Sequence, residues 1–505
     1  SASLGSQSCH RSNHSTAQQA PLNLEKKVDV EAFKATAAEA PGEVHIDAQG
    51  EVSLVKDSDV IVVVDQQCMA QRADASSQSK YPFTANLKIR KKSEKMSKND
   101  SYKVKMWKTL PISEVQSAAM ADDCVVSVSK NVIATAWIIP DDPGYAQQTH
   151  LTAINHGVNY DYFFNTTDGI KNDTVIAVID NGVDIHHEDL VDHLWVNVAE
   201  KNGVTGVDDD HNGYVDDING YDFATNVADP NHKYPADNNA GHTHGTHVAG
   251  LAAAVTNNTK GVAGTMSQHS RIMALNVFGN SDGAQTNNID TAIRYAADMG
   301  AKVINMSLGG PGKASSTQQA LQYAVSKGAI VVVAAGNDGG NPNMNNGVMT
   351  ATNWYTPASY GVSIDGMVTI GATDANPASV GELCSFSNRS PTYVELGAPG
   401  CDTAQSSMGI LATYKNNKYG FMAGTSMASP VAAGFAATIY SYVRDHYNKN
   451  LTPAEVESLL KNGSKNYSSL NSYITNGKDI DFSTLKTQII NDYGTVNPPT
   501  PGPCP

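Results

Sequence analysis

The chain has 505 residues, of which 40% are hydrophobic and 17% charged, so it is long enough for more than one domain and can build a substantial core. Its formal net charge of -15 argues against a nucleic-acid or anionic-membrane partner, because both require clustered Lys and Arg side chains. The sequence contains no run of about eighteen apolar residues, so we expect no transmembrane segment.

The six cysteines are sparse and none belongs to a C-x-x-C pair, which argues against a zinc site. The first residue is Ser1, which is compatible with removal of a signal peptide and equally with a trimmed chain. Because disulfides suit secreted proteins, we expect a secreted protein, extracellular or periplasmic. The sequence does not fix the connectivity, but the two pairs to test first are Cys68 with Cys124 and Cys384 with Cys401.

The N-terminal part predicts an extension followed by a small α+β domain. In the extension, residues 1–57, the first 25 positions are rich in Ser, His, Gln and Asn and lack an apolar period, so we expect disorder there. The small domain is expected over residues 58–135. Its predicted elements are strands at 60–64, 102–107 and 124–128 and a helix at 111–120. These elements suit one antiparallel sheet.

Strands and helices alternate in the main domain, expected over residues 136–490 after a Pro-rich break at 140–144. The predicted strands are 175–179, 272–277, 303–306 and 330–334, and the predicted helices include 288–299 and 317–326. This order predicts an α/β fold with a mostly parallel sheet and helices on both faces. Ligands bind beyond the carboxyl ends of such strands, so we expect the chemistry there. Residues 491–505 are a Pro-rich tail.

Ser426 stands among small residues at the start of an apolar helical run, in the sequence GTSMASP at residues 424–430. A Ser in the first turn of a helix presents its oxygen where free N–H groups and the helix dipole can hold an oxyanion. Small neighbours leave room for a substrate carbonyl. An ordinary N-cap serine would look the same, so the remainder of the chain has to decide.

Three histidines, His242, His244 and His247, lie within six residues of one another and have two explanations. They could form the metal cluster of a metal-dependent hydrolase, or His244 could be a single general base and His247 a structural residue. The spacing is similar to a zinc motif of the metallo-β-lactamase fold, but that motif needs an Asp where this chain has Thr246. We therefore favour the single base and keep the metal-dependent hydrolase as an alternative.

Asp180 directly follows the predicted strand 175–179, so the chain contains an acid, a base and a hydroxyl in the order Asp180, His244, Ser426. This order is also that of subtilisin. The segments VIDNGVD at 178–184, HGTHVAG at 244–250 and GTSMASP at 424–430 resemble the three signature motifs of the subtilisin-like serine proteases. The resemblance covers about residues 140–465.

The resemblance implies an endopeptidase of broad specificity that acts on proteins or peptides. Ser426 would attack the peptide carbonyl, His244 would take its proton, and Asp180 would orient His244. A non-catalytic binding module on the same fold is a second alternative, but it would require a broken triad. At Asn181 the family more often has Ser or Thr, which puts the tuning of Asp180 in question.

Further site residues follow from the same resemblance. Asn337, in the sequence AAGN, corresponds to the side chain that completes the oxyanion hole, with the backbone N–H of Ser426 as the second donor. Ser307, Leu308 and Gly309 resemble the edge to which an extended peptide adds as an antiparallel strand. The small residues Ala334, Ala335 and Gly336 would floor the first pocket and leave room for a large apolar side chain.

The acidic run at 208–217 predicts a calcium site. Oxygen-bearing side chains alternate there and a Gly is sixth, as at the start of an EF-hand loop, although the acidic residue at position twelve is missing. Such dense like charges repel one another without a cation; a solvated acidic turn is the alternative. The expected ligands are Asp208, Asp210, Asn212, the carbonyl of Tyr214, and Asp216 or Asp217.

A second calcium site is implied by the resemblance alone. Asp189 and the loop 255–262 correspond to family positions that hold a structural calcium, with Gln148 as a further ligand. Within the loop the expected ligands are Asn257 and Val262. The loop is one residue longer than the shortest family version, so the sequence leaves open which Asn points inward.

The resemblance also assigns a role to residues 58–135. In this family a ferredoxin-like propeptide of about this size helps the catalytic domain to fold and occupies its substrate cleft. The intact chain would then be an autoinhibited zymogen, cut between residues 130 and 139, and its own propeptide would be an intramolecular inhibitor. We expect a monomer. A permanent accessory domain is the alternative.

Overall fold

The structure is a computed structural model that describes residues 139–164, 169–231, 243–279, 281 and 283–494, together with the backbone of four strands between residues 55 and 132. The chain divides into two compact units, Glu31–Trp137 and a larger unit that includes Ile138–Pro505.

The smaller unit contains a four-stranded antiparallel sheet with the strand order β2-β3-β1-β4. The strands are β1 (Val55–Val64), β2 (Ile89–Lys95), β3 (Ser101–Met106) and β4 (Val125–Val132). One antiparallel sheet was the expectation from the alternating sequence pattern. The predicted helix at 111–120 lies outside the described residues, as do Cys68 and Cys124.

A nine-stranded sheet with the order β16-β17-β13-β12-β10-β8-β5-β7-β6 forms the centre of the larger unit. All its strand pairs are parallel except β16 with β17, which confirms the mostly parallel sheet. Its strands are β5 (Thr174–Asp180), β6 (Gly220–Asp222), β7 (Ser270–Asn276), β8 (Val303–Met306), β10 (Ile330–Ala334), β12 (Met367–Asp374), β13 (Leu396–Cys401), β16 (Lys465–Asn466) and β17 (Lys478–Asp479). Two separate antiparallel pairs are β9 (Gly310–Pro311) with β11 (Tyr355–Thr356) and β14 (Ile410–Tyr414) with β15 (Lys418–Met422).

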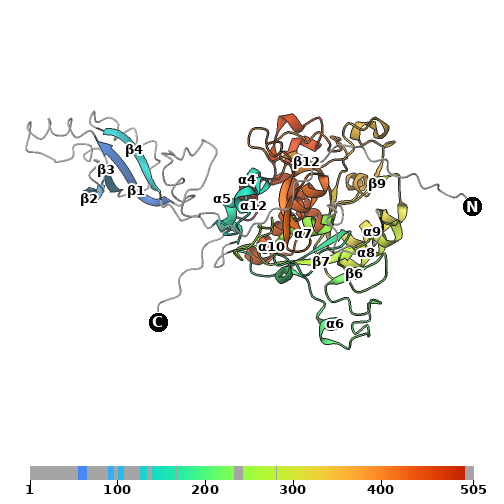
Figure 1. Cartoon of the computed structure of the whole chain (residues 1–505). Helices are drawn as coiled ribbons and strands as arrows, with labels where there is room; N and C mark the ends of the chain where they lie inside the picture. Colours follow the sequence, from blue (N-terminus) through green and yellow to red (C-terminus); the bar gives the residue numbers. More distant parts are fainter. Residues whose placement is uncertain are drawn as a thin grey trace, which may run out of the picture. The chain divides into compact units, whose positions relative to one another are not determined.

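Helices cover both faces of this sheet (Figure 1). They are α4 (Thr149–Ala153), α5 (His156–Phe164), α6 (Val198–Asn202), α7 (His244–Ala253), α8 (Thr286–Asp298), α9 (Ser315–Ser326), α10 (Thr425–Tyr447), α11 (Pro453–Asn462) and α12 (Phe482–Tyr493). Along β5, Ile176 and Val178 share a core with α7 and α10, while Ala177 and Ile179 share a second core with α8 and α9. Side chains alternate across a strand, so a sheet covered on both faces requires continuous apolar runs.

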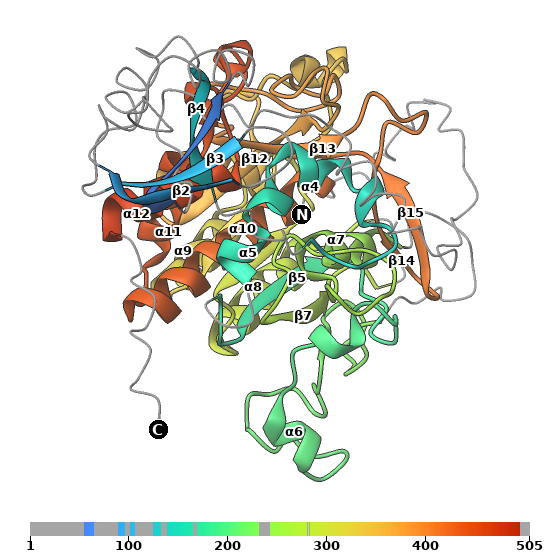
Figure 2. The ribbon, with the colours of Figure 1, turned by 90° about the vertical axis from the view of Figure 1, so that its left-hand side faces the viewer.

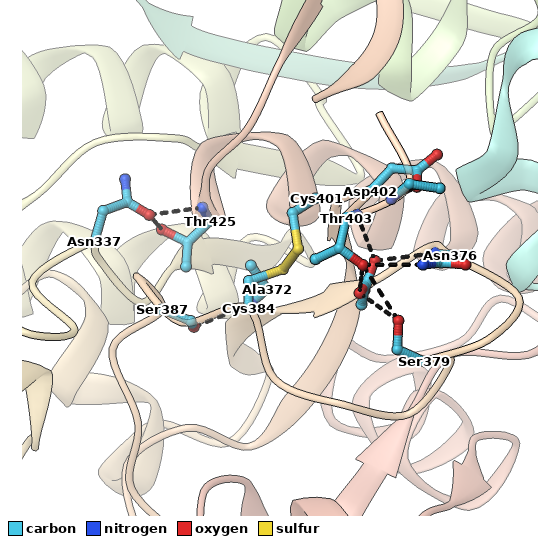
Figure 3. Close-up of a disulfide and its surroundings, with 12 residues drawn as sticks. Asn337, Ala372, Asn376, Ser379, Cys384, Ser387, Cys401, Asp402, Thr403 and Thr425 are labelled. Atoms are coloured by element: carbon cyan, nitrogen blue, oxygen red, sulfur yellow. Dashed lines mark hydrogen bonds between the residues drawn. A yellow bond between two sulfur atoms is a disulfide. The ribbon is translucent and has the colours of Figure 1, made fainter. Parts of the chain in front are cut away.

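Among the described helices, none combines the length and the apolar character needed to cross a membrane. The segment around α6 projects from the rest of the larger unit (Figure 2). The structure confirms one of the two cysteine pairs: Cys384 and Cys401 are buried and form a disulfide with an S–S distance of 2.06 Å (Figure 3). It joins the loop after β12 to the last residue of β13.

Candidate active site

Three neighbouring parallel strands end where the predicted site residues lie. Asp180 is the last residue of β5, Ser307 directly follows β8, and the chain reaches Asn337 just after β10. Because β10, β8 and β5 are adjacent in the sheet, these residues come to one edge. Helices α7 and α10 begin at His244 and Thr425, so each contributes residues from its first turn.

Asp180 and His244 form the expected acid–base pair. The Nδ1–H of His244 donates to Oδ1 of Asp180 at 2.8 Å, and the N–H of Asn181 donates to the same oxygen at 2.8 Å. Burial alone lowers the pKa of His244, but the charge of Asp180 and its hydrogen bond outweigh that effect, so the pKa is raised. The His244 side chain remains 25% exposed. With Nδ1 engaged, Nε2 is the nitrogen that can accept a proton.

Asn181 and Gly245 bring helix α7 onto the end of β5. The Oδ1 of Asn181 accepts from the N–H of Gly245 at 2.9 Å, which ties the first turn of the helix to the strand. A Cβ on Gly245 would lie 2.2 Å from the carbonyl oxygen of Gly182 and 3.0 Å from the Cβ of Asp180. Only a glycine therefore allows this approach. The amide at 181 supports the acid–base pair through the backbone of the helix that carries the base.

The hydroxyl of Ser426 donates to the carbonyl oxygen of Ser307 at 3.3 Å, and the hydroxyl of Ser307 donates to the carbonyl oxygen of Ser426 at 2.8 Å. Ser426 thus does not hydrogen-bond His244 in this structure, although the resemblance predicts that His244 takes the proton of Ser426. Both residues lie in the described part of the chain. One rotation about Cα–Cβ redirects a serine hydroxyl, and bonds between catalytic groups often tighten only when substrate is bound.

Asn337 and Ser426 each place a hydrogen-bond donor beside one small space. The Oδ1 of Asn337 accepts from the backbone N–H of Thr425 at 2.8 Å and from its hydroxyl at 3.0 Å, so this oxygen is fully engaged. The Nδ2 of Asn337 and the backbone nitrogen of Ser426 each lie 3.5 Å from the point where a Cβ on Gly424 would stand. The absence of a side chain at Gly424 leaves that point open. Two donors around such a space suit an oxyanion.

Residues 171–479, more than half of the chain, match the family model of the subtilase family. The chain belongs to the subtilase family. A thermophilic serine proteinase from Bacillus sp. (strain AK1) is 38% identical over 286 residues, which are 57% of this chain and 56% of that protein. Thermitase from Thermoactinomyces vulgaris is 36% identical over 273 residues, 54% of this chain and 77% of thermitase.

An extracellular protease from Xanthomonas campestris pv. campestris is 34% identical over 359 residues, which are 68% of this chain and 56% of that protein. This subtilase therefore spans little more than half the length of two of these three relatives.

The described histidines of the predicted cluster do not face a common metal. His244 is engaged with Asp180, and the Nε2 of His247 contacts the carbonyl oxygen of Gly420 at 3.2 Å inside the core. Among the described residues, the potential metal-ligating side chains whose ligand atoms come together are those of Glu200, Asp208 and Asp210, and neither histidine belongs to this group. His242 lies outside the described residues. The structure thus favours a single base at His244 over a metal-dependent hydrolase.

Several other histidines of this subtilase are buried, and they make its stability depend on pH. Burial lowers the pKa of His150, His156 and His247 to about 3 and that of His193 to about 4. An unfolded chain takes up these protons near pH 6.5, whereas the folded chain does not. We therefore expect stability to fall as the pH drops from about 6.5 toward 4, by about 1.4 kcal/mol per pH unit for each histidine that stays neutral in the fold.

Urea unfolding of the Ser426→Ala variant, which avoids self-digestion, measures this pH dependence. Both ring nitrogens of His150 are buried without a hydrogen-bond partner among the described residues, so this residue is the one to replace. His150→Leu should show a shallower loss of stability between pH 6.5 and 4 than the parent. Equal slopes would contradict the assignment.

Two of the ligands predicted for the first calcium site come together with one unexpected residue. Ligand oxygens of Glu200, Asp208 and Asp210 all lie within 4.8 Å of one another. Glu200 belongs to α6, outside the acidic loop, and supplies an acidic group that the loop lacks at its twelfth position. Nothing in the linear spacing pointed to it, because its place depends on how α6 folds back onto the loop.

Two of the expected ligands in that loop make other hydrogen bonds and do not belong to the acidic trio. Asp217 is fully buried and accepts from the hydroxyl of Tyr295 at 2.5 Å and from the side chain of Asn197 at 2.9 Å. Burial raises the pKa of Asp217. Asp216 accepts from the N–H of Gly206 at 2.8 Å. Asp216 and Asp217 thus lie outside the acidic trio, and their role as calcium ligands stays a prediction.

The other two expected ligands lie beside the acidic trio. The Nδ2 of Asn212 donates to Asp210 at 3.1 Å, so its amide nitrogen, not its oxygen, faces that carboxylate. The ring of Tyr214 packs edge-on against Tyr295 with ring centroids 5.1 Å apart. This packing fixes the turn from which the Tyr214 carbonyl was expected to bind.

At the second predicted site the structure settles which asparagine faces Asp189. The Oδ1 of Asp189 accepts from Nδ2 of Asn258 at 2.7 Å, and its Oδ2 accepts from the N–H of Val262 at 2.8 Å. Asn257, the predicted ligand, instead donates to the hydroxyl of Tyr160 at 2.7 Å. Asn258, not Asn257, is thus the side chain that bonds Asp189, and the role of Asn257 as a calcium ligand stays a prediction.

Asp142 is a further acidic residue at this second site. The side chain of Gln148, the predicted ligand, makes two hydrogen bonds to the backbone of Ala263. Its Nε2 donates to the carbonyl oxygen at 2.8 Å, and its Oε1 accepts from the N–H at 2.8 Å. Asp142 is buried, and its Oδ1 has no hydrogen-bond partner among the described residues. Burial raises the pKa of Asp142 to about 7; burial likewise raises that of Asp189, and the charge of Asp142 adds to this rise. Two buried acids, one of which raises the pKa of the other, are an arrangement that a cation would relieve.

Proposed function

We propose that this subtilase is a serine endopeptidase with Ser426 as nucleophile, His244 as general base and Asp180 as the group that orients the base. The observation that carries the proposal is the 2.8 Å bond from His244 to Asp180 at the strand ends that also hold Ser307 and Asn337. Two of the relatives are named a serine proteinase and an extracellular protease, which is the same class of activity.

The geometry supports the following steps. The Nε2 of His244 accepts the proton of the Ser426 hydroxyl while the oxygen attacks the substrate carbonyl carbon. The resulting oxyanion accepts hydrogen bonds from Nδ2 of Asn337 and from the N–H of Ser426. The imidazolium, stabilised by Asp180, then protonates the leaving amine, and water hydrolyses the acyl-enzyme in the reverse sequence.

A peptide substrate would lie in extended form along Ser307, Leu308 and Gly309. Ser307 is buried against Ser426, whereas Gly309 is exposed, so this edge leads from the nucleophile to solvent. The small residues Ala334, Ala335 and Gly336 line the next strand end. Backbone pairing makes few demands on sequence, which supports broad specificity toward proteins and peptides.

Hydrolysis of a chromogenic peptide tests the proposal. The matured chain should be active, and Ser426→Ala should lose that activity while keeping its melting temperature. A zinc chelator should leave the initial rate unchanged. Zinc-dependent activity that survives Ser426→Ala would instead support a metal-dependent hydrolase, and a folded, matured chain that binds peptides without cleaving them would be a binding module.

We also propose that calcium stabilises this subtilase at two sites. The first site comprises Glu200, Asp208 and Asp210, an all-oxygen set suited to a hard cation. The second comprises the buried carboxylates of Asp142 and Asp189, and Oδ1 of Asp142 has no hydrogen-bond partner among the described residues. Bound calcium would neutralise these carboxylates and hold the segments that carry them; it takes no part in the chemistry.

Removal of calcium should therefore lower the melting temperature of the Ser426→Ala variant. A ligand at 100 times its dissociation constant stabilises a fold by about 2.7 kcal/mol per site. Glu200→Gln and Asp142→Asn should each remove part of the calcium-dependent shift. The matched control is Asp365→Asn, an exposed carboxylate outside both sites, which should leave the shift intact. A melting temperature that does not respond to a chelator would contradict both sites.

Residues 58–135 are proposed to be a propeptide that inhibits the catalytic domain of a secreted, monomeric zymogen. The antiparallel sheet β2-β3-β1-β4 supports a folded unit, and one relative is named an extracellular protease. Incubation with calcium should release a product that begins between residues 130 and 139, as terminal sequencing would show. Ser426→Ala should stay uncut. A wild-type chain that is active with these residues still attached would indicate an accessory domain.

A further inference from the structure

The amide of Asn337 sits on a short turn that needs external support. The turn follows β10, lies outside any helix or strand, and exposes Asn337 to solvent. Thr425 fixes the oxygen of the Asn337 side chain, but the backbone on either side of Asn337 must also be held if Nδ2 is to point at the oxyanion. Displacements of about 1 Å in such groups are costly to catalysis.

Asn388 supplies that support through three hydrogen bonds. Its Nδ2 donates to the carbonyl oxygen of Ala335 at 2.9 Å, and its Oδ1 accepts from the N–H of Asp338 at 2.9 Å. Its own backbone N–H donates to the carbonyl oxygen of Gly336 at 2.8 Å. The three bonds thus bracket Asn337 from both sides. Asn388 is fully buried, so it does not touch solvent.

Two glycines make room for the Asn388 side chain. Gly336 has φ +107°, and a Cβ there would lie 2.4 Å from Nδ2 of Asn388. A Cβ on Gly347 would lie 2.6 Å from Oδ1 of the same side chain. Asn388 therefore fills the space that side chains at 336 and 347 would need, and its orientation is fixed by contacts on both sides.

The loop that presents Asn388 is tied to the other half of the oxyanion site by the disulfide. The backbone N–H of Ser387 donates to the carbonyl oxygen of Cys384 at 2.9 Å, so the loop is ordered from the disulfide to Asn388. At the other end, Cys401 follows Gly400, whose carbonyl oxygen accepts from the N–H of Gly424 at 2.9 Å. Figure 3 shows the disulfide next to the bonded pair of Asn337 and Thr425.

We propose that Asn388 is a positioning residue for the oxyanion site: it fixes the turn 335–338 so that Nδ2 of Asn337 and the N–H of Ser426 face one point. The inference rests on the proposed peptidase function and adds a residue to it. Asn388 acts only through Asn337. Removal of the Asn388 side chain should therefore lower kcat and leave KM nearly unchanged. The loss of kcat should occur only while Asn337 is present.

A double-mutant cycle on the matured enzyme tests this dependence. Asn388→Ala should lower kcat about 10- to 100-fold. In the Asn337→Ala background the same change should alter kcat by less than about twofold, because the group that Asn388 positions is already gone. Asn388→Asp keeps the side-chain shape and the acceptor for Asp338 but loses the donor to Ala335, so it provides a second variant if the alanine form does not fold.

The matched control is Asn159→Ala. Asn159 of α5 is also buried, and its Nδ2 donates to the carbonyl oxygen of Asn155, just before α5, at 2.8 Å and to the hydroxyl of Ser483 in α12 at 2.9 Å. This change should lower the melting temperature and leave kcat unchanged. The proposal is wrong if the folded Asn388 variants keep wild-type kcat, or if Asn388→Ala lowers kcat by the same factor with and without Asn337.

Failure of this inference can be told apart from failure of the proposed function. If the wild type has no peptidase activity that depends on Ser426, the function itself is wrong, and the role of Asn388 falls with it. If the wild type is active and Asn337→Ala impairs it, the function stands, and the cycle alone decides the role of Asn388.

Discussion

Replacement of His244 by Ala is expected to lower kcat by about six powers of ten, with a similar loss for Ser426→Ala and no further loss in the double variant. The reason is that the two side chains act as one unit: the hydroxyl is a poor nucleophile until Nε2 of His244 takes its proton. The measurement is kcat with a chromogenic peptide. Losses that add up in the double variant would contradict a shared role.

Asp180 determines how the activity of the Ser426–His244 pair depends on pH. The carboxylate raises the pKa of His244 against the effect of burial, and the base must be neutral to work. Activity should therefore fall as the pH drops through the pKa of His244. Asp180→Asn removes the charge that raises this pKa, so the acidic limb of kcat/KM should move to lower pH while the maximal rate falls by about four powers of ten.

Asn337→Ala is expected to lower kcat by about two to three powers of ten and to leave KM within about threefold of the wild-type value. The Nδ2 donor is needed most when the carbonyl oxygen becomes an oxyanion, so its loss affects the transition state more than the bound substrate. A suitable control is Asn343→Ala, an exposed asparagine in the 3-10 helix that follows (Pro342–Gly347), which should keep full kcat. An Asn337→Ala enzyme with wild-type kcat would exclude the proposed oxyanion site.

The strand ends of the site could be predicted from the sequence because its pattern is strong there. The β-branched run before Asp180 is buried on both faces, and polar residues that can take part in catalysis follow each such run. Parallel strands then bring Asp180, Ser307 and Asn337 to one edge without further information. The disulfide of Cys384 with Cys401 was one of two candidates, and only the fold shows that these cysteines meet.

The calcium ligands show where linear spacing fails. Asp217 belongs to the acidic run, but it is buried, bonds Tyr295 and does not belong to the acidic trio. Glu200 stands shortly before the acidic run and Asp142 far in sequence from the loop 255–262, and only the path of the chain brings them to these sites. Side chains that serve a backbone turn, such as Asn388, carry no motif of their own. Their roles depend on hydrogen bonds between segments distant in sequence.

The most direct test of the account is to treat the matured protein with a fluorophosphonate and locate the adduct by peptide mass spectrometry. The account predicts a single adduct on the Ser426 oxygen, formed rapidly by the wild type and far more slowly by His244→Ala. A protein that cleaves peptides yet carries no adduct at Ser426, or reacts equally fast without His244, would contradict it.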